Sequence, residues 1–243
     1  MSVEDRFADA LLQLAATLPE VELLPVRLAK ACVSVLPAAG AGLCALVHPE
    51  LRLPIGASDE IAAYVERLQF TYAEGPCLRA YATGRPLVFS AAVIERLWPE
   101  LHRDLTAVTP FRAVVSLPLR DGTTRIGALD LYLTKSTVLP PADLADALTI
   151  ADLVAEALVA ARIYTAAAQR ADPFGSVSSI HLDPLVPRIQ VWKAMGMLNV
   201  HWKLTTADAL ALLRAHAYAT ERLVDDVAHD VVTRRIPMSA LRP

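Results

Sequence analysis

Two adjacent segments near the middle of the chain constrain the fold more than any other feature. "RAVVSLPLR" covers residues 112–120 and "TRIGALDLYLT" covers 124–134, with Asp121-Gly122 between them. Asp-Gly between two strand-like segments is a strong signal for a hairpin turn. Both faces of the second segment are largely apolar, so its sheet must be covered by helices on at least one face. The pair therefore predicts a mainly antiparallel sheet flanked by helices, which is an α+β fold.

The remaining patterns supply the other elements of this first domain. The sequence pattern predicts helices at 3–18, 22–36 and 59–69, and either a helix or a loop followed by a helix at 91–105. A shorter helix is expected at 74–84, because Pro76 suits a first turn and Gly84 suits a helix end. Three more strands are expected, two within 40–58 around a turn at His48-Pro49-Glu50 and one at "RPLVFS".

An alanine-rich segment, 141–171, predicts one long helix that connects the first domain to the rest of the chain. It has two apolar stripes, one of which can cover the sheet. The second stripe faces either a neighbouring helix of the same domain or a second copy of the protein. The dimer interpretation assigns the interface to Ile150, Val154, Ala157 and Ala161.

A proline- and serine-rich linker at 172–187 divides the chain into two modules. We therefore expect a first domain at 1–140, the connecting helix at 141–171 and a small C-terminal module at 188–236. Three helical patterns follow the linker, at about 188–202, from Thr205-Thr206-Ala207-Asp208 onward, and from Val224 to about Arg235. They predict a three-helix bundle with a small core.

The first of these helices contains an unexpected glycine in "VWKAMGMLNVHWKL", residues 191–204. Glycine costs a helix roughly 1 kcal/mol relative to alanine. We expect Gly196 to permit close approach of a neighbouring helix, and the surrounding basic and aromatic side chains to face a partner. The expected bundle core comprises Ala194, Gly196, Ala209, Leu213, Ala217 and Ala228, and Trp192 and Trp202 are interpreted as core residues slightly in preference to surface ones.

Charge and composition narrow the class of protein. Residues 186–243 hold eight basic and five acidic residues, a net charge of +3, whereas residues 1–185 carry −6. A polyanionic partner would therefore meet the C-terminal module. The N-terminus lacks a signal-peptide pattern, and acidic residues interrupt the apolar run at 144–161, so we expect a cytoplasmic protein without a membrane span.

No catalytic or metal-binding motif is evident. The three cysteines are widely spaced, the six histidines are scattered, and no nucleophile lies in a pattern with a base, so neither an enzyme nor a metal site is predicted. Cys77 is expected at a helix N-terminus, where a thiol pKa can fall. A packed structural thiol is favoured there over a redox role.

Two family resemblances follow from particular residues. Pro76, Gly84-Arg85-Pro86, Trp98-Pro99, Arg112, Leu117-Pro118-Leu119 and Gly127-Ala128-Leu129-Asp130 resemble the GAF sensor domains of actinobacterial regulators, over roughly residues 5–165. Ala194, Gly196, Ala209, Leu213-Arg214, Ala217, Leu223 and Val227-Ala228 resemble an ANTAR domain, the RNA-binding module of antitermination regulators. One departure is Lys203, where relatives often have a small residue, so this helix end lacks a glycine cap.

The resemblance implies a homodimeric antitermination regulator whose C-terminal bundles bind hairpin RNA. The residues expected on or near the RNA surface are Lys193, Asn199, Lys203, Arg214, His216, Tyr218 and Arg222. The GAF domain would bind an unidentified small ligand or serve as a dimerisation scaffold, and no cofactor is predicted. The alternative is a ligand-binding or dimerisation protein whose bundle binds a protein partner.

Overall fold

The predicted hairpin lies within a five-stranded antiparallel sheet. The computed structural model describes residues 1–48, 51–135, 139–171 and 186–242. Its strands are β1 (Gly40–His48), β2 (Leu51–Ala57), β3 (Leu87–Ser90), β4 (Ala113–Asp121) and β5 (Thr124–Leu133), in the order β2-β1-β5-β4-β3. Asp121 pairs with Thr124 across the turn, and Gly122 has a φ of 58°, a conformation that favours glycine. The hairpin prediction is confirmed.

The helices follow the predicted order with shifts at their ends. They are α1 (Val3–Thr17), α2 (Leu24–Val35), α3 (Glu60–Tyr72), α4 (Pro76–Thr83), α5 (Ala91–Leu97), α6 (Pro99–Val108), α7 (Pro141–Ala171), α8 (Val186–Trp202), α9 (Thr206–Ala219) and α10 (Val224–Val232), with short 3-10 turns at Val21–Leu23 and Met238–Ala240. The segment 91–105 is two helices, because Pro99 begins a new one after Trp98.

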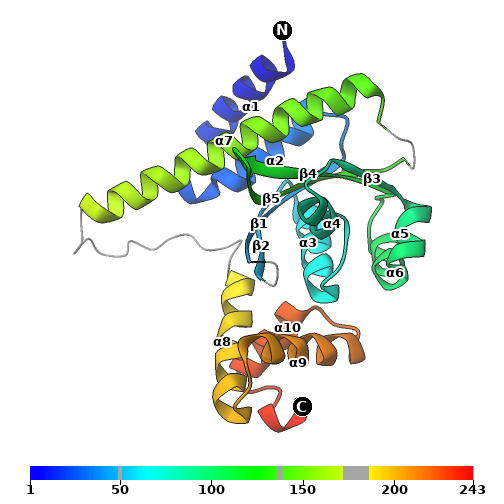
Figure 1. Cartoon of the computed structure of the whole chain (residues 1–243), viewed down its shortest axis with the longest axis vertical. Coiled ribbons are helices and arrows are strands. Elements are labelled where there is room, and N and C mark those ends of the chain that lie inside the picture. The colour runs from blue at the N-terminus through cyan, green and yellow to red at the C-terminus, as the bar shows by residue number, and fades with distance from the viewer. Residues whose placement is uncertain (49–50, 136–138, 172–185, 243) are drawn as a thin grey trace.

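Helices cover both faces of the sheet (Figure 1). On one face α1, α2 and α7 enclose the main core, which includes Leu28, Val115, Leu129 and Ile150. On the other face lie α3 and α4, which pack against β1, β2, β4 and β5. Successive strand residues point to opposite faces, so Leu129 and Leu131 join the main core while Asp130 faces α3 and α4.

The connecting helix α7 buries parts of both its apolar stripes inside its own domain. Ile150 and Val154 are completely buried in the main core with Ala151 and Ala155. The assignment of Ile150 and Val154 to a dimer interface is therefore wrong, because these side chains cover the sheet. Ala157 and Ala161 are only half-buried and stay predicted dimer contacts. Within the described residues, no helix combines the length and apolarity needed to cross a membrane.

The C-terminal module forms the predicted bundle of α8, α9 and α10, which lies below the first domain in Figure 1. The Thr205 side chain accepts a hydrogen bond from the Asp208 backbone amide and starts α9 as predicted. Helix α10 ends at Val232, three residues earlier than expected, and Arg234 then adopts a φ of 61°. Most of the linker, 172–185, lies outside the described residues.

Candidate functional site

A cluster of polar side chains is buried between the sheet and α3. Glu66 and Gln69 come from α3, Arg52 from β2, Ser116 from β4, and Asp130 and Tyr132 from β5; each is at most 2% exposed. Arg52 forms an ion pair with Glu66, and its guanidinium also donates 2.7 Å to the Glu66 backbone carbonyl. The cluster thus fills the side of the sheet that faces α3.

Hydrogen bonds tie this cluster to both sheet and helix. Tyr132 donates to Glu66 at 2.5 Å, while Ser116 and Gln69 donate to the two oxygens of Asp130 at 2.5 and 2.7 Å. Gly42 makes the arrangement fit, because a Cβ at that position would collide with the Glu66 side chain. The glycine opposite Asp130 in the β1–β5 register therefore leaves room for a carboxylate from the helix.

Burial changes the protonation of Asp130. Desolvation, followed by repulsion from Glu66, raises the pKa of Asp130 to about 7, against the hydrogen bonds from Ser116 and Gln69 and the charge of Arg52 that act to lower it. The Asp130 carboxyl therefore changes charge near neutral pH.

The bundle core matches the prediction except at one position. Ala194, Ala209, Leu213, Ala217 and Ala228 are completely buried, together with residues such as Leu198 and Val227. Gly196 is instead exposed, and a Cβ built on it meets no atom within 4 Å. The expectation that Gly196 brings two helices together is wrong, because it lies on the outer face of α8.

Gly196 forms part of an exposed groove with a volume of about 620 Å³. Met197 and Val200 of α8, Val232 and Met238 supply the apolar lining, and Lys193 and His201 supply the polar groups. Among the described residues, no acidic side chain lines the groove. Trp192 lies one turn before Gly196 on α8 and is 41% exposed, so its interpretation as a core residue is wrong. Trp202 is half-buried against the bundle and donates to the Met238 carbonyl at 3.3 Å.

The structure does not bring the seven predicted RNA contacts together on one surface. Lys193 lines the groove, and Lys203 is exposed just after α8. The Asn199 amide lies between α8 and the start of α9, within 3.4 Å of the Thr206 hydroxyl, a position that joins the two helices.

The other predicted contacts lie on or just after α9. Arg214 and Tyr218 face the first domain: Arg214 donates to the Phe70 carbonyl at 3.1 Å, and the Tyr218 ring meets Tyr72 edge-on. Arg222 pairs with Asp230 at 2.6 Å, and His216 is half-buried in the last turn of α9. The seven residues therefore do not form one continuous surface in this arrangement.

Lys203 takes a conformation that the sequence argument did not expect. It has a φ of 55°, in the left-handed region, directly after the end of α8. The chain therefore forms a left-handed helix end with lysine in place of glycine, at a cost of roughly 1 kcal/mol.

Comparison with known proteins identifies the first domain. Residues 21–159 match the family model described as GAF domain. The chain belongs to the GAF domain family. GAF domains act in signalling proteins as modules for small-ligand sensing or dimerisation. The family match ends within α7, so the first part of the connecting helix belongs to the GAF domain.

Solved structures of GAF domains are among the similar folds. A GAF domain from a phosphoenolpyruvate-protein phosphotransferase of Coxiella burnetii is 16% identical, with a TM-score of 0.49, covering 66% of this chain and 97% of that one. A domain of a putative two-component sensor histidine kinase from Sinorhizobium meliloti 1021 is 15% identical, with a TM-score of 0.47 and coverages of 58% and 92%. The phycoerythrobilin-bound GAF domain of a cyanobacterial phytochrome is 12% identical, with a TM-score of 0.47 and coverages of 68% and 98%. The search of curated proteins gave no match.

The cysteines of the GAF domain are packed thiols. Cys32, Cys44 and Cys77 are all buried and free. Desolvation, together with a hydrogen bond to Cys44, raises the pKa of Cys77 well above its ordinary value, although the Arg52 charge acts to lower it. The position at the start of α4 therefore does not activate this thiol, which agrees with the structural role favoured from the sequence.

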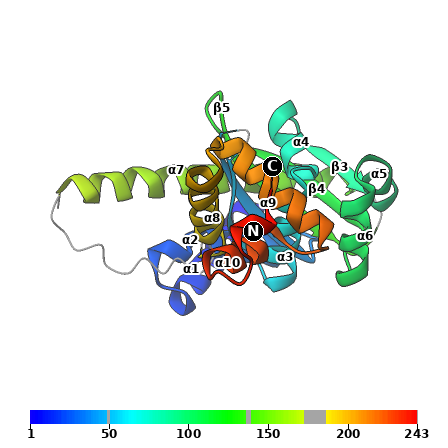
Figure 2. The ribbon, with the colours of Figure 1, turned by 90° about the horizontal axis from the view of Figure 1, so that it is seen from below.

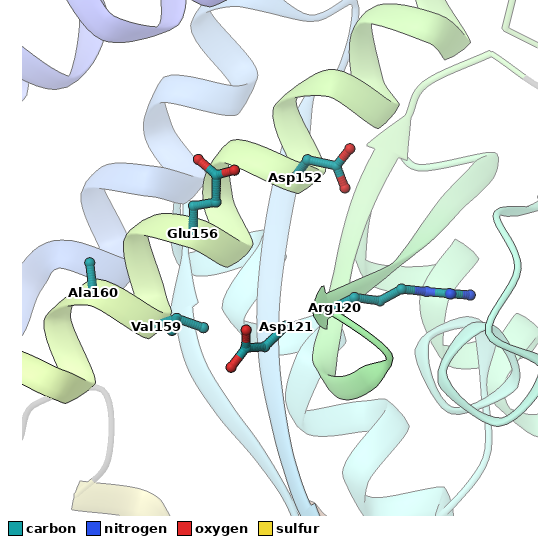
Figure 3. A pocket seen from close by; sticks show the side chains of 7 residues that line it. Arg120, Asp121, Asp152, Glu156, Val159 and Ala160 are labelled. Atoms are coloured by element: carbon teal, nitrogen blue, oxygen red, sulfur yellow. The ribbon is translucent and has the colours of Figure 1, made fainter.

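A second groove on the GAF domain has the opposite charge to the groove on the bundle. It lies between the β4–β5 turn and α7, has a volume of about 550 Å³, and is lined by Arg120, Asp121, Gly122, Asp152, Glu156, Val159 and Ala160. Figure 3 shows Arg120 directed away from α7, toward α4, where it donates to the Gly84 carbonyl. The three carboxylates on this surface would repel nucleic-acid phosphates.

Sequence reasoning missed the buried cluster in the GAF domain altogether. Arg52, Glu66 and Gln69 are residue types that are usually exposed. Asp130 was recognised only as part of a family motif. The available signal was the alternation in β5, which places Asp130 on the same face as the buried Ala128 and Tyr132.

Proposed function

We propose that this protein is an RNA-binding transcription antitermination regulator in which the C-terminal bundle binds hairpin RNA. The observation that carries the proposal is the groove over Gly196. Its apolar lining suits the faces of unstacked bases, and Lys193 at its side suits a neighbouring phosphate. Hairpin loops are where RNA presents such bases to proteins.

The charge distribution supports the same partner. The described residues that line the groove include a lysine and a histidine and no carboxylate, whereas the groove on the GAF domain is acidic. Lys203 adds a further exposed cation at the end of α8. A polyanion would therefore be drawn to the bundle and kept away from the sensor domain.

In this proposal the GAF domain serves chiefly as a scaffold. The space between its sheet and α3 is occupied by the buried polar side chains of the chain itself, which are Arg52, Glu66, Gln69, Ser116, Asp130 and Tyr132. A small ligand at that place would have to displace hydrogen-bonded charges, which is costly. Dimerisation through the outer part of α7, near Ala157 and Ala161, remains part of the proposal.

The decisive experiment fills the groove without disturbing the bundle. Gly196→Leu adds a side chain whose Cβ meets no atom within 4 Å and which extends into the exposed groove, so the bundle should stay folded by circular dichroism. Binding to a pool of RNA hairpins with randomised loops, measured by fluorescence anisotropy, should weaken at least roughly tenfold, a loss of about 1.4 kcal/mol. Ala211→Leu, at an exposed position of α9, should leave binding unchanged.

Lys193 provides an independent test of the electrostatic part. Lys193→Ala should weaken binding alike for all hairpin sequences and reduce the magnitude of the salt slope by about 1, as loss of one phosphate contact does. Equal affinity of the parent protein for hairpins, single strands and duplex DNA would contradict antitermination.

A protein partner is the second candidate, and the apolar lining of the groove favours it. An amphipathic helix can lie in such a groove and use the same residues. The two candidates differ in salt dependence, because burial of apolar side chains responds little to moderate salt. A parent protein without salt-dependent RNA affinity would leave the protein partner as the better explanation.

A further inference from the structure

The last turn of α3 holds the C-terminal bundle against the GAF domain. Phe70 is buried and belongs to the core of the bundle, although it lies on a GAF helix. The Arg214 guanidinium lies over the Phe70 ring at 4.7 Å from its centroid, and Arg214 Nε donates to the Phe70 carbonyl at 3.1 Å. A cation at the C-terminal end of a helix is stabilised by the helix dipole as well as by the ring.

Thr71 completes this contact by capping a helix of the other module. The N-cap residue of α10 is Leu223, whose side chain forms no capping hydrogen bond. The backbone amide of Val224, the first residue of α10, instead donates to the Thr71 hydroxyl at 3.1 Å in a buried position. Such an amide has no partner within its own helix, so the GAF domain supplies part of the α10 cap.

Tyr72 and Leu223 extend the interface. Tyr72 and Tyr218 meet edge to face with ring centroids 6.3 Å apart, and Leu223 joins the core cluster between α3 and α6. A cavity of about 40 Å³ remains beside them, lined by residues of both modules. Figure 2 shows α3 behind α9 and α10, in agreement with these contacts.

The same helix connects this interface to the buried polar cluster. Gln69 donates to Asp130 at 2.7 Å and accepts from the Cys77 amide at 3.2 Å, and Glu66 pairs with Arg52 one turn earlier. Gln69 and Phe70 are adjacent in sequence but face opposite modules. A displacement of Gln69 would therefore also displace the adjacent residues that hold the bundle.

We propose that Phe70, Thr71 and Tyr72 form a latch that keeps Arg214 engaged with the GAF domain and withheld from RNA. Tyr218 meets Tyr72 at the edge of this contact and is 57% exposed, so Arg214 is the residue that the latch withholds. Release of the latch at the end of α3 would expose Arg214 and add one more cation to those that the bundle presents to RNA. The consequence for RNA rests on the function proposed above. The latch itself can be measured without RNA.

The test compares two threonine substitutions in the full-length chain. Both threonine hydroxyls donate to the backbone carbonyl four residues earlier in their own helix, but only the Thr71 hydroxyl also accepts from the Val224 amide. Thr71→Val therefore removes the contact between the modules, and Thr106→Val in α6 is the matched control. Hydrogen exchange of the first turn of α10 should be at least about fivefold faster in Thr71→Val than in the parent. Thr106→Val should match the parent. Tyr72→Ala, at a half-buried position, is a second opening variant should Thr71→Val fold poorly.

RNA binding to the same hairpin pool then separates the two proposals. Faster exchange together with at least roughly fivefold tighter RNA binding in Thr71→Val or Tyr72→Ala supports the latch. Unchanged exchange at α10 in both variants overturns it, whatever RNA does. Faster exchange with parent-like RNA affinity overturns the latch as a control on RNA and leaves the RNA function standing. Faster exchange with no RNA binding by any variant overturns the RNA function and the RNA consequence of the latch with it.

Discussion

The GAF domain and the C-terminal bundle use glycine in opposite ways. In the GAF domain, Gly42 and Gly127 lie in the sheet where a Cβ would collide with Glu66 or with the backbone of β1. In the bundle, Gly196 lies on an outer helix face where a Cβ meets nothing. In the GAF domain, the absent Cβ atoms leave room for buried groups of neighbouring segments. In the bundle, the absent Cβ leaves the groove open. The comparison therefore sets a filled interior in the GAF domain against an open groove on the bundle.

The largest predicted effect concerns the buried ion pair of the GAF domain. Arg52→Met leaves the Glu66 carboxylate buried without its cation, which typically costs about 3–5 kcal/mol. Chemical denaturation of the full chain should show this loss in the GAF transition. Arg52→Met/Glu66→Gln should recover a large part of it, since no uncompensated charge then remains. A single variant as stable as the parent would contradict the importance of the pair.

The next prediction sharpens the glycine comparison directly. Gly127→Ala should destabilise the GAF domain by about 1–3 kcal/mol, because the new methyl group would meet the Cys44 carbonyl and the backbone cannot easily move. Gly196→Ala is the matched control and should stabilise the bundle by roughly 1 kcal/mol through helix propensity. Thermal denaturation measures both. The contrast between the two regions disappears if both substitutions change stability in the same direction.

The third prediction is a pH dependence centred on Asp130. Its pKa is about 7 in the folded protein and 3.8 ordinarily, so folding favours the protonated carboxyl. The corresponding stabilisation is complete below about pH 4 and is lost as pH rises through 7, with a slope of at most about 1.4 kcal/mol per pH unit. Asp130→Asn should remove this contribution. Denaturation of parent and variant at pH 5 and pH 8 tests it; an identical pH dependence in the two proteins would refute the raised pKa.

The smallest predicted effect lies at the end of α8. Lys203→Gly should stabilise the bundle by roughly 0.5–1 kcal/mol, since glycine adopts the observed positive φ without strain. The change also removes one exposed cation, so RNA affinity should fall slightly while the melting temperature rises. A lower melting temperature would indicate that the lysine side chain makes a stabilising contact.

Local signals predicted the elements of this protein well. Asp121-Gly122 predicted the hairpin, Pro76 and Gly84 predicted both ends of α4, and Thr205 predicted the start of α9, because each of these residues acts on its own neighbourhood. The RNA-binding function of the bundle stays a proposal. What local signals could not predict is which residues from distant segments meet, such as Arg52 with Glu66.

The error at Gly196 was avoidable. Val191, Ala194, Met195 and Leu198 are the buried stripe of α8, at the spacing of one helix face. Trp192, Gly196 and Val200 form the adjoining stripe, which is exposed. The contact of Phe70 with the bundle was not predictable in this way, because nothing in either segment indicates that two modules separated by a linker will pack together.

The cap that Thr71 supplies to α10 limits how the C-terminal bundle can be transplanted. A fragment that begins at Val186 loses both the Phe70 ring from its core and the acceptor for its Val224 amide. In a chimaera with another sensor domain, the end of α3 would have to be carried along with the bundle. The bundle can therefore be moved to another protein only together with the last turn of α3.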